Sequence, residues 1–203
     1  MINEPVSVRW IKLGIVAGLC SSILYPLLIF SSLPLFMTAL LAGILGPAIG
    51  VASLGLRELL LIRGNSVSAR VGAVANFTAG ALFTAMALVQ LACRYAPASE
   101  TASAMPVGVW LGLDVAWDIY IGLGTAFFSV AMLRHERFGA LFAVPGVLIA
   151  LLVIGLNIAT FPTPPAEAGL IDIGPFVGLW YLAVTVRTWR SLPWAREHAQ
   201  SHA

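Results

Sequence analysis

Asp114 and Asp118 lie inside an apolar stretch that runs from Val107 to about Leu133. A helix of this length can cross the hydrocarbon core of a bilayer, which is about 30 Å thick. At about 1.5 Å per residue, Asp118 would lie roughly 16 Å from Val107, close to the middle of that core. Asp114 shares its helical face, one turn nearer the surface. Exposure to lipid would cost each carboxylate on the order of 3 kcal/mol, so both are expected to face the protein interior, water or a partner.

Paired carboxylates support three kinds of chemistry: they exchange a proton or a cation, hold a divalent metal, or act as general acid and base. The sequence has no G-x-S-x-G, H-E-x-x-H or G-x-x-x-x-G-K-S motif. His135, His198 and His202 all lie outside the apolar stretches, which argues against a haem or zinc site within them. We therefore expect no catalytic residue, no metal site and no cofactor.

The composition defines the class of protein that must position these aspartates. Apolar residues make up 60% of the 203 residues and charged residues only 10%, far from the usual balance of a soluble domain. A chain of this length has room for about six spanning helices joined by short connections. The sequence thus predicts an all-α integral membrane bundle, with residues 1–203 forming a single transmembrane domain.

Six apolar segments can be assigned as spans. They cover about residues 10–30, 35–56, 71–93, 107–133, 139–161 and 170–189. The second span is expected to leave the membrane as an interfacial turn or two over residues 57–63. The connections are expected at residues 64–68, 95–106, 134–137 and 162–169, the last being a stiff proline-rich loop, and the tail from residue 190 to residue 203 is expected to be frayed.

Basic residues predict the orientation of the bundle, because they accumulate in cytoplasmic loops. Ten fall on one side of the assigned spans: Arg9, Lys12, Arg57, Arg63, Arg70, Arg134, Arg137, Arg187, Arg190 and Arg196. Arg94 falls alone on the other side. Both termini are therefore expected in the cytoplasm, and the bases report topology rather than binding to nucleic acid.

Small residues recur four positions apart in several spans, a spacing that lets membrane helices approach closely. The pairs are Gly14 with Gly18, Gly46 with Gly50, and Gly108 with Gly112. We interpret all three as packing faces, within the bundle or between copies of the chain in an oligomer.

Most polar side chains inside the spans fall in the outer half once the orientation is assigned. They come from four spans: Gln90 and Arg94, Asp114 and Asp118, Asn157, and Asp172. If these residues converge, three carboxylates face one guanidinium. The excess negative charge would then be neutralised by protonation or would attract a cation. The predicted ligand-binding or ion-binding group is this set of six residues.

Each member of the group also has a structural interpretation. Arg94 can extend to the lipid headgroups or form an ion pair with Asp114. Asp172 can cap a helix that begins one residue later. Asn157 can bridge two helices by hydrogen bonding. Asp118 is the hardest to explain structurally, because it lies too deep to reach the outer interface.

Two stretches carry a resemblance to a known family: residues 113–124, and residues 157–165 leading into residues 172–181. They resemble a family of small bacterial multi-pass membrane proteins described as a domain of unknown function, the DUF4386 type. The resemblance covers mainly the last three spans. It implies a location in the bacterial inner membrane and supplies no activity or catalytic residue.

Three functions fit these observations. The first is proton-linked or cation-linked transport, or binding of a small molecule, at an outward-facing acidic site; the partners expected are the lipid bilayer and a proton, cation or small molecule. The second is a non-catalytic subunit or sensor in which the aspartates hold the bundle together. The third, ranked last, is an intramembrane enzyme acting on lipid.

Overall fold

The structure is a computed structural model that describes residues 5–62, 66–95 and 104–199, with side chains from Val107 onward in the last range. This part of the chain folds into seven helices. They are α1 (Val6–Phe30), α2 (Leu35–Leu61), α3 (Val67–Tyr95), α4 (Ala104–Leu133), α5 (Ala140–Thr160), α6 (Gly174–Arg190) and α7 (Leu192–Ala199).

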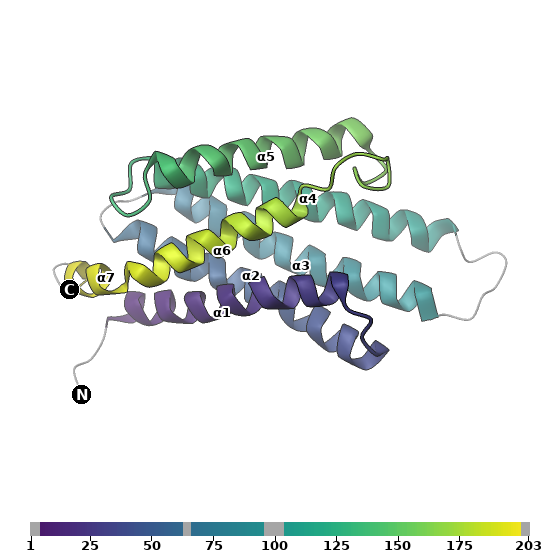
Figure 1. The fold of residues 1–203 in the computed structure, drawn as a ribbon, viewed down its shortest axis with the longest axis horizontal. Helices are drawn as coiled ribbons and strands as arrows, with labels where there is room; N and C mark the ends of the chain where they lie inside the picture. Colours follow the sequence, from purple (N-terminus) through teal and green to yellow (C-terminus); the bar gives the residue numbers. More distant parts are fainter. Residues whose placement is uncertain (1–4, 63–65, 96–103, 200–203) are drawn as a thin grey trace.

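The first six helices run roughly along one common direction (Figure 1), and the contacts between successive helices arrange them in a ring. Each helix from α1 to α4 packs along most of its length against the next, and α6 closes the ring by contacting α1 and α5. The short helix α7 lies at one end, against α1 and α6. Because α6 makes fewer contacts than the other long helices, the ring is most open beside it.

Five of these helices, α1 to α5, are long and apolar enough to cross a membrane. Large hydrophobic side chains are exposed along them, such as Ile23, Val74, Leu141 and Leu151, and such side chains suit contact with lipid. This is the architecture of a multi-pass membrane protein. The sixth helix, α6, has 17 residues, which is a length of roughly 26 Å.

The helix bounds correct the expected bounds in several places. Helix α2 continues past residue 56 to Leu61, so the expected interfacial turns are part of this helix as far as Leu61. Helix α6 begins at Gly174 rather than near residue 170, because Leu170 and Ile171 are exposed in the connection before it. The tail, expected to be frayed, forms α7 up to Ala199 and buries Ala195. Most of the expected loop at residues 95–106 lies outside the described residues, but its first and last residues belong to helices α3 and α4.

Two of the three predicted glycine pairs lie at helix contacts. A methyl group built on Gly14 would come within 2.5 Å of the Gly55 Cα, and one on Gly46 would overlap the Gly80 carbonyl oxygen. Helices α1, α2 and α3 therefore touch backbone to backbone at these points. Gly108 and Gly112 form no packing face within the described part of the bundle, because nothing lies within 4 Å of the space a side chain would take there. Their role as a face between copies of the chain stays a prediction.

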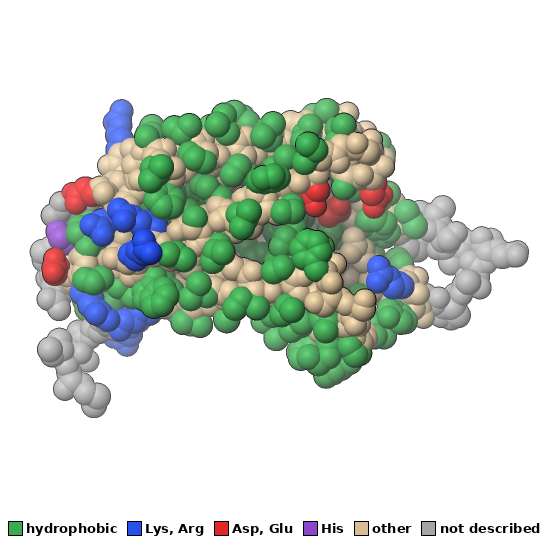
Figure 2. All heavy atoms as spheres, in the orientation of Figure 1, with side chains coloured by type: hydrophobic (Ala, Val, Ile, Leu, Met, Phe, Trp, Pro, Cys, Tyr) green, Lys and Arg blue, Asp and Glu red, His purple; other side chains and the backbone are tan. Residues whose placement is uncertain are grey.

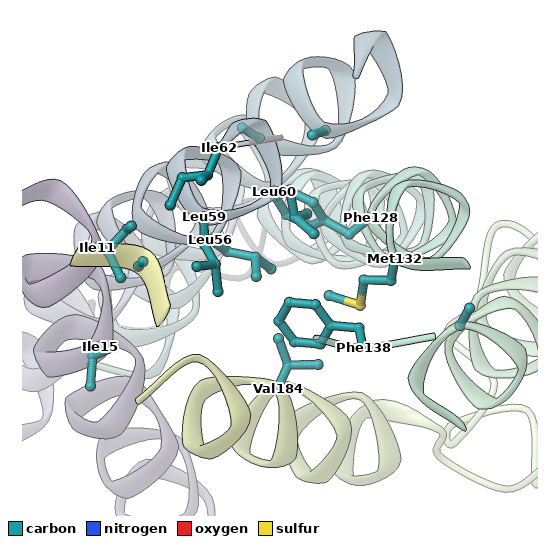
Figure 3. Packing of buried hydrophobic residues seen from close by; sticks show 14 of the residues in the cluster. Ile11, Ile15, Leu56, Leu59, Leu60, Ile62, Phe128, Met132, Phe138 and Val184 are labelled. Atoms are coloured by element: carbon teal, nitrogen blue, oxygen red, sulfur yellow. The ribbon is translucent and has the colours of Figure 1, made fainter. Parts of the chain in front are cut away.

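The largest apolar core lies in the half of the bundle near α7. Figure 3 shows Leu56, Leu59, Phe128, Met132 and Val184 pointing toward one another from α2, α4 and α6. Phe128 and Met132 are completely buried. This core fixes the end of the bundle near α7, and three of its members, Ile15, Leu56 and Val184, also line the cavity described below.

The turn between α4 and α5 is held to this core through His135. Its ring packs edge-on against Trp194 of α7, with centroids 5.5 Å apart, and its Nδ1 accepts a hydrogen bond of 3.2 Å from the Arg137 amide. Burial lowers the pKa of His135 below its ordinary value of 6.5, while the Leu59 backbone acts in the opposite direction. The ring is therefore held in its neutral form.

This burial predicts a pH dependence of stability. The folded protein binds the His135 proton more weakly than the unfolded chain does, so the contribution of His135 is present above pH 6.5 and is lost as the pH falls below it. We expect the thermal unfolding midpoint in detergent to fall more steeply from pH 7.5 to 5.5 in the wild type than in His135→Phe, which keeps an aromatic ring without a titrating group. Equal slopes in the two proteins would contradict this assignment.

Candidate functional site

A hydrogen bond between Asp118 and Asn157 joins α4 to α5 inside the bundle. The Asn157 Nδ2 atom donates to the Asp118 Oδ2 atom at 2.9 Å and to the Val153 carbonyl oxygen, also at 2.9 Å. Asn157 is only 2% exposed. Its Oδ1 atom is buried and has no hydrogen-bond partner among the described residues. The Asp118 carboxylate therefore sits beside an open acceptor.

Three further acidic side chains lie close enough to act electrostatically on this region. The negative charges of Asp114 and Asp172 act on the Asp118 carboxylate, and those of Asp172 and Glu167 act on the Asp114 carboxylate. Asp114 lies one turn from Asp118 on α4, whereas Asp172 and Glu167 come from the connection between α5 and α6 and are exposed. The acidic group, defined as Asp114, Asp118, Asp172 and Glu167, thus extends from the bundle interior to its surface.

Tyr25 of α1 faces the same group across the ring. Its hydroxyl lies within electrostatic range of Asp172, Asp118 and Asp114. A Cβ atom built on Gly174 would lie 2.8 Å from the Tyr25 Oη atom and 3.0 Å from the Asp172 Oδ1 atom. The missing side chain of Gly174 therefore lets the Tyr25 hydroxyl and the Asp172 carboxylate both approach the start of α6 closely.

The N-cap of α6 is Ile173 rather than Asp172 as expected, but the Asp172 side chain still bonds to the start of the helix. Its Oδ1 atom accepts a hydrogen bond of 2.8 Å from the Gly174 amide, which is the first residue of α6. Pro175 occupies the first turn, where its missing N–H is not needed. The hydrogen bond to Gly174 uses one carboxylate oxygen, so the other remains available to the acidic group.

Arg94 and Gln90 do not join the group. Arg94 is exposed at the end of α3, and the part of the chain that is described contains no ion pair between it and an aspartate. No basic residue is among the charges that act on Asp118. Gln90 is half-buried in α3, and its side chain has no hydrogen bond among the described residues. The group is therefore acidic without an internal counter-charge.

A cavity of about 310 Å³ lies beside the acidic group, between α1, α2, α4 and α6. Figure 2 shows the molecule hollowed between α6 and α1, with acidic side chains at one rim. The lining is mainly apolar and includes Ile15, Leu56 and Ile121, with Tyr25, Trp117 and Gly174 at the end nearest the acids. This volume is at the small end of the range typical of ligand pockets.

A second polar cluster fixes the cavity wall but lies apart from the acids. The Tyr181 hydroxyl accepts a hydrogen bond from the Asn76 Nδ2 atom at 2.6 Å and contacts the Thr125 hydroxyl at 3.1 Å. Asn76 and Thr125 are completely buried, and Tyr181 lines the cavity. These bonds hold Tyr181 in one position between α3, α4 and α6.

Sequence reasoning missed Tyr25, Glu167 and Gly174 as members of this region. A signal for Tyr25 exists, because its hydroxyl lies near the end of an apolar span at the depth of the other polar groups. Glu167 and Gly174 carry no such signal, because their proximity to the aspartates depends on the path of the connection before α6.

The arrangement can neutralise a positive charge inside an apolar bundle. Carboxylates and an amide oxygen are acceptors, and they complement a ligand that donates several hydrogen bonds. No three His, Cys, Asp or Glu side chains of the described ranges are placed to hold a metal ion together. The acceptors that are present suit a proton or an organic cation with N–H donors.

Comparison of the chain with family models, curated proteins and solved structures finds no match.

Proposed function

We propose that this protein binds a small cation at Asp118 and carries it across a membrane by exchange with a proton. A single observation carries the proposal. The Asp118 carboxylate lies in a spanning helix, accepts a hydrogen bond from Asn157, and interacts with the negative charges of other acidic residues rather than with a basic residue. A carboxylate in this setting is neutralised either by its own proton or by a bound cation. A proton on the Asp118 carboxylate excludes the cation, and a bound cation excludes the proton. Transport of the cation in one direction is therefore coupled to transport of a proton in the other.

The proposed topology has six spans, α6 being the sixth, with both termini in the cytoplasm. The described basic residues support this orientation, because all but Arg94 belong to the helix ends and connections at the α7 end of the ring. Figure 2 shows Lys and Arg side chains gathered there on the visible face. By the positive-inside rule, the acidic group opens away from the cytoplasm. A bacterial inner membrane and the DUF4386-type family belong to the same proposal.

A second candidate function is a non-catalytic subunit or sensor in which Asp118 only joins two helices. Its hydrogen bond to Asn157 favours this candidate. In that case Asp118→Leu would lower the unfolding temperature, and cations would have no effect on the wild type. An intramembrane enzyme acting on lipid stays the third candidate.

Uptake of radiolabelled guanidinium into proteoliposomes tests the proposal. Guanidinium is permanently charged, so it does not cross lipid as a neutral base, and its fork of N–H donors suits carboxylates. We expect uptake driven by an outward-directed proton gradient in the wild type and at least a tenfold lower rate in Asp118→Asn. The Asn side chain can still accept the hydrogen bond from Asn157, so folding should be preserved.

The matched control is Glu197→Gln, which removes one negative charge from α7 at the opposite end of the bundle. It should transport at the wild-type rate. Equal uptake by Asp118→Asn and wild type would rule out this role for Asp118, and wild-type uptake no faster than in protein-free liposomes would rule out transport.

A further inference from the structure

We propose that the cation is amphiphilic, with an N–H-bearing head in the acidic group and an apolar tail in the adjoining cavity. This inference rests on the proposed cation site and names the class of ligand that the site takes. It joins two features that the transport proposal leaves separate: the acids of α4 and the connection before α6, and the apolar cavity along α1 and α6.

The cavity and the acids meet at shared residues. Trp117 lines the cavity and directly precedes Asp118 in α4. Tyr25 lines the cavity, and both its hydroxyl and the Asp172 carboxylate approach Gly174 closely at the start of α6. The four acidic side chains are not among the residues that line the cavity, so in this proposal the charged head extends past Tyr25 and Trp117 to reach them.

The shape and lining of the cavity suit a chain rather than a compact ion. Its lining residues on α1 include Gly14 and Tyr25, which are roughly 16 Å apart along the helix. The side chains between these ends are mostly apolar. Tyr25 and Trp117, at the acidic end, are aromatic side chains of the kind that attract cations.

Asn157 provides an independent indication of a ligand with donors. It is 2% exposed, and its Oδ1 atom has no hydrogen-bond partner within the described ranges. Its Nδ2 atom donates a hydrogen bond to Asp118, so the amide that carries this acceptor is in direct contact with the carboxylate. A buried acceptor without a partner is costly, and an ammonium or guanidinium head would satisfy it together with Asp118.

The test is competition between alkylguanidinium ions of increasing length and radiolabelled guanidinium bound to the purified full-length protein in detergent. The free aqueous concentration of each alkylguanidinium ion is measured by dialysis. The measured affinities are then not distorted by partition of the longer ions into detergent micelles. Each buried methylene contributes about 0.8 kcal/mol, so each two-carbon step from butyl to hexyl to octyl should tighten binding roughly 15-fold.

A cavity-filling variant shows where the tail lies. Ala52→Phe places a ring in the cavity and should reduce the increase in affinity from butylguanidinium to octylguanidinium at least tenfold. Gly178→Leu fills the cavity from α6 and is a second variant with the same purpose. Ala81→Phe adds the same ring on the exposed surface of α3 and should keep the full gain.

The outcomes separate the two proposals. If guanidinium binds in an Asp118-dependent manner but octylguanidinium binds no more tightly than guanidinium, the amphiphilic ligand is ruled out and the cation site stands. A chain-length gain that Ala52→Phe and Gly178→Leu both leave intact also rules out this cavity as the tail site. If no guanidinium binds, the cation site itself fails and this inference fails with it.

Discussion

Gly46→Ala is expected to destabilise the bundle by on the order of 3 kcal/mol. The new Cβ would overlap the Gly80 carbonyl oxygen of α3 and the Thr84 hydroxyl. A backbone oxygen cannot move aside as a flexible side chain can, so α2 and α3 must separate along their whole contact. Overpacking of this kind typically costs about 1–3 kcal/mol, and sometimes more.

Gly43→Ala is the matched control, because Gly43 lies one turn away on the same helix with nothing within 4 Å of its Cβ position. Both substitutions gain the same helix propensity, up to about 1 kcal/mol. Unfolding by denaturing detergent should therefore show Gly46→Ala well below the wild type and Gly43→Ala at or above it. Similar stabilities for the two variants would contradict the close contact between α2 and α3.

The long helices could be predicted from the sequence because uninterrupted apolar stretches of about 20 residues have few other structures open to them in a membrane. The helix ends were less predictable. Leu170 and Ile171 look like the start of a span, yet the chain enters α6 only at Gly174, where the Asp172 side chain accepts a hydrogen bond from the amide. Hydropathy registers the apolar residues but not the hydrogen bond at the point where the helix begins.

Helix α7 was missed for a related reason. Its sequence is polar, and nothing in its composition separates it from a frayed tail. It is held by tertiary contacts: Ala195 is completely buried, and Trp194 packs against His135 of a distant turn. Such contacts depend on where the ends of other helices meet, which local patterns do not encode.

The candidate site, too, could be predicted only in part from the sequence. Depth along each span could be estimated from the sequence, and it correctly placed Asp118 beside Asn157. Depth does not give the direction in which a side chain points around its helix. Arg94 was grouped with the acids on depth alone, whereas the described structure leaves it exposed and without an ion pair to them. Tyr25 and Gly174 joined the site only when the ring of helices was known.

Equilibrium binding of radiolabelled guanidinium to the purified protein tests the central claim, that Asp118 holds a cation inside the bundle. We expect one cation per wild-type chain, displaced as the pH is lowered, because protons compete for the same carboxylate. Removing one partner of a buried, hydrogen-bonded charge pair costs at least about 2 kcal/mol. Asp118→Asn should therefore bind on the order of 100-fold more weakly, and Asp114→Asn should be affected less.

Glu197→Gln serves again as the control for removing one negative charge, and thermal unfolding checks that each variant is folded. The predicted result is saturable binding of one cation per chain that Asp118→Asn weakens on the order of 100-fold, with an unchanged unfolding temperature. Binding that Asp118→Asn and Glu197→Gln weaken equally, or no saturable binding to the wild type, would contradict the account.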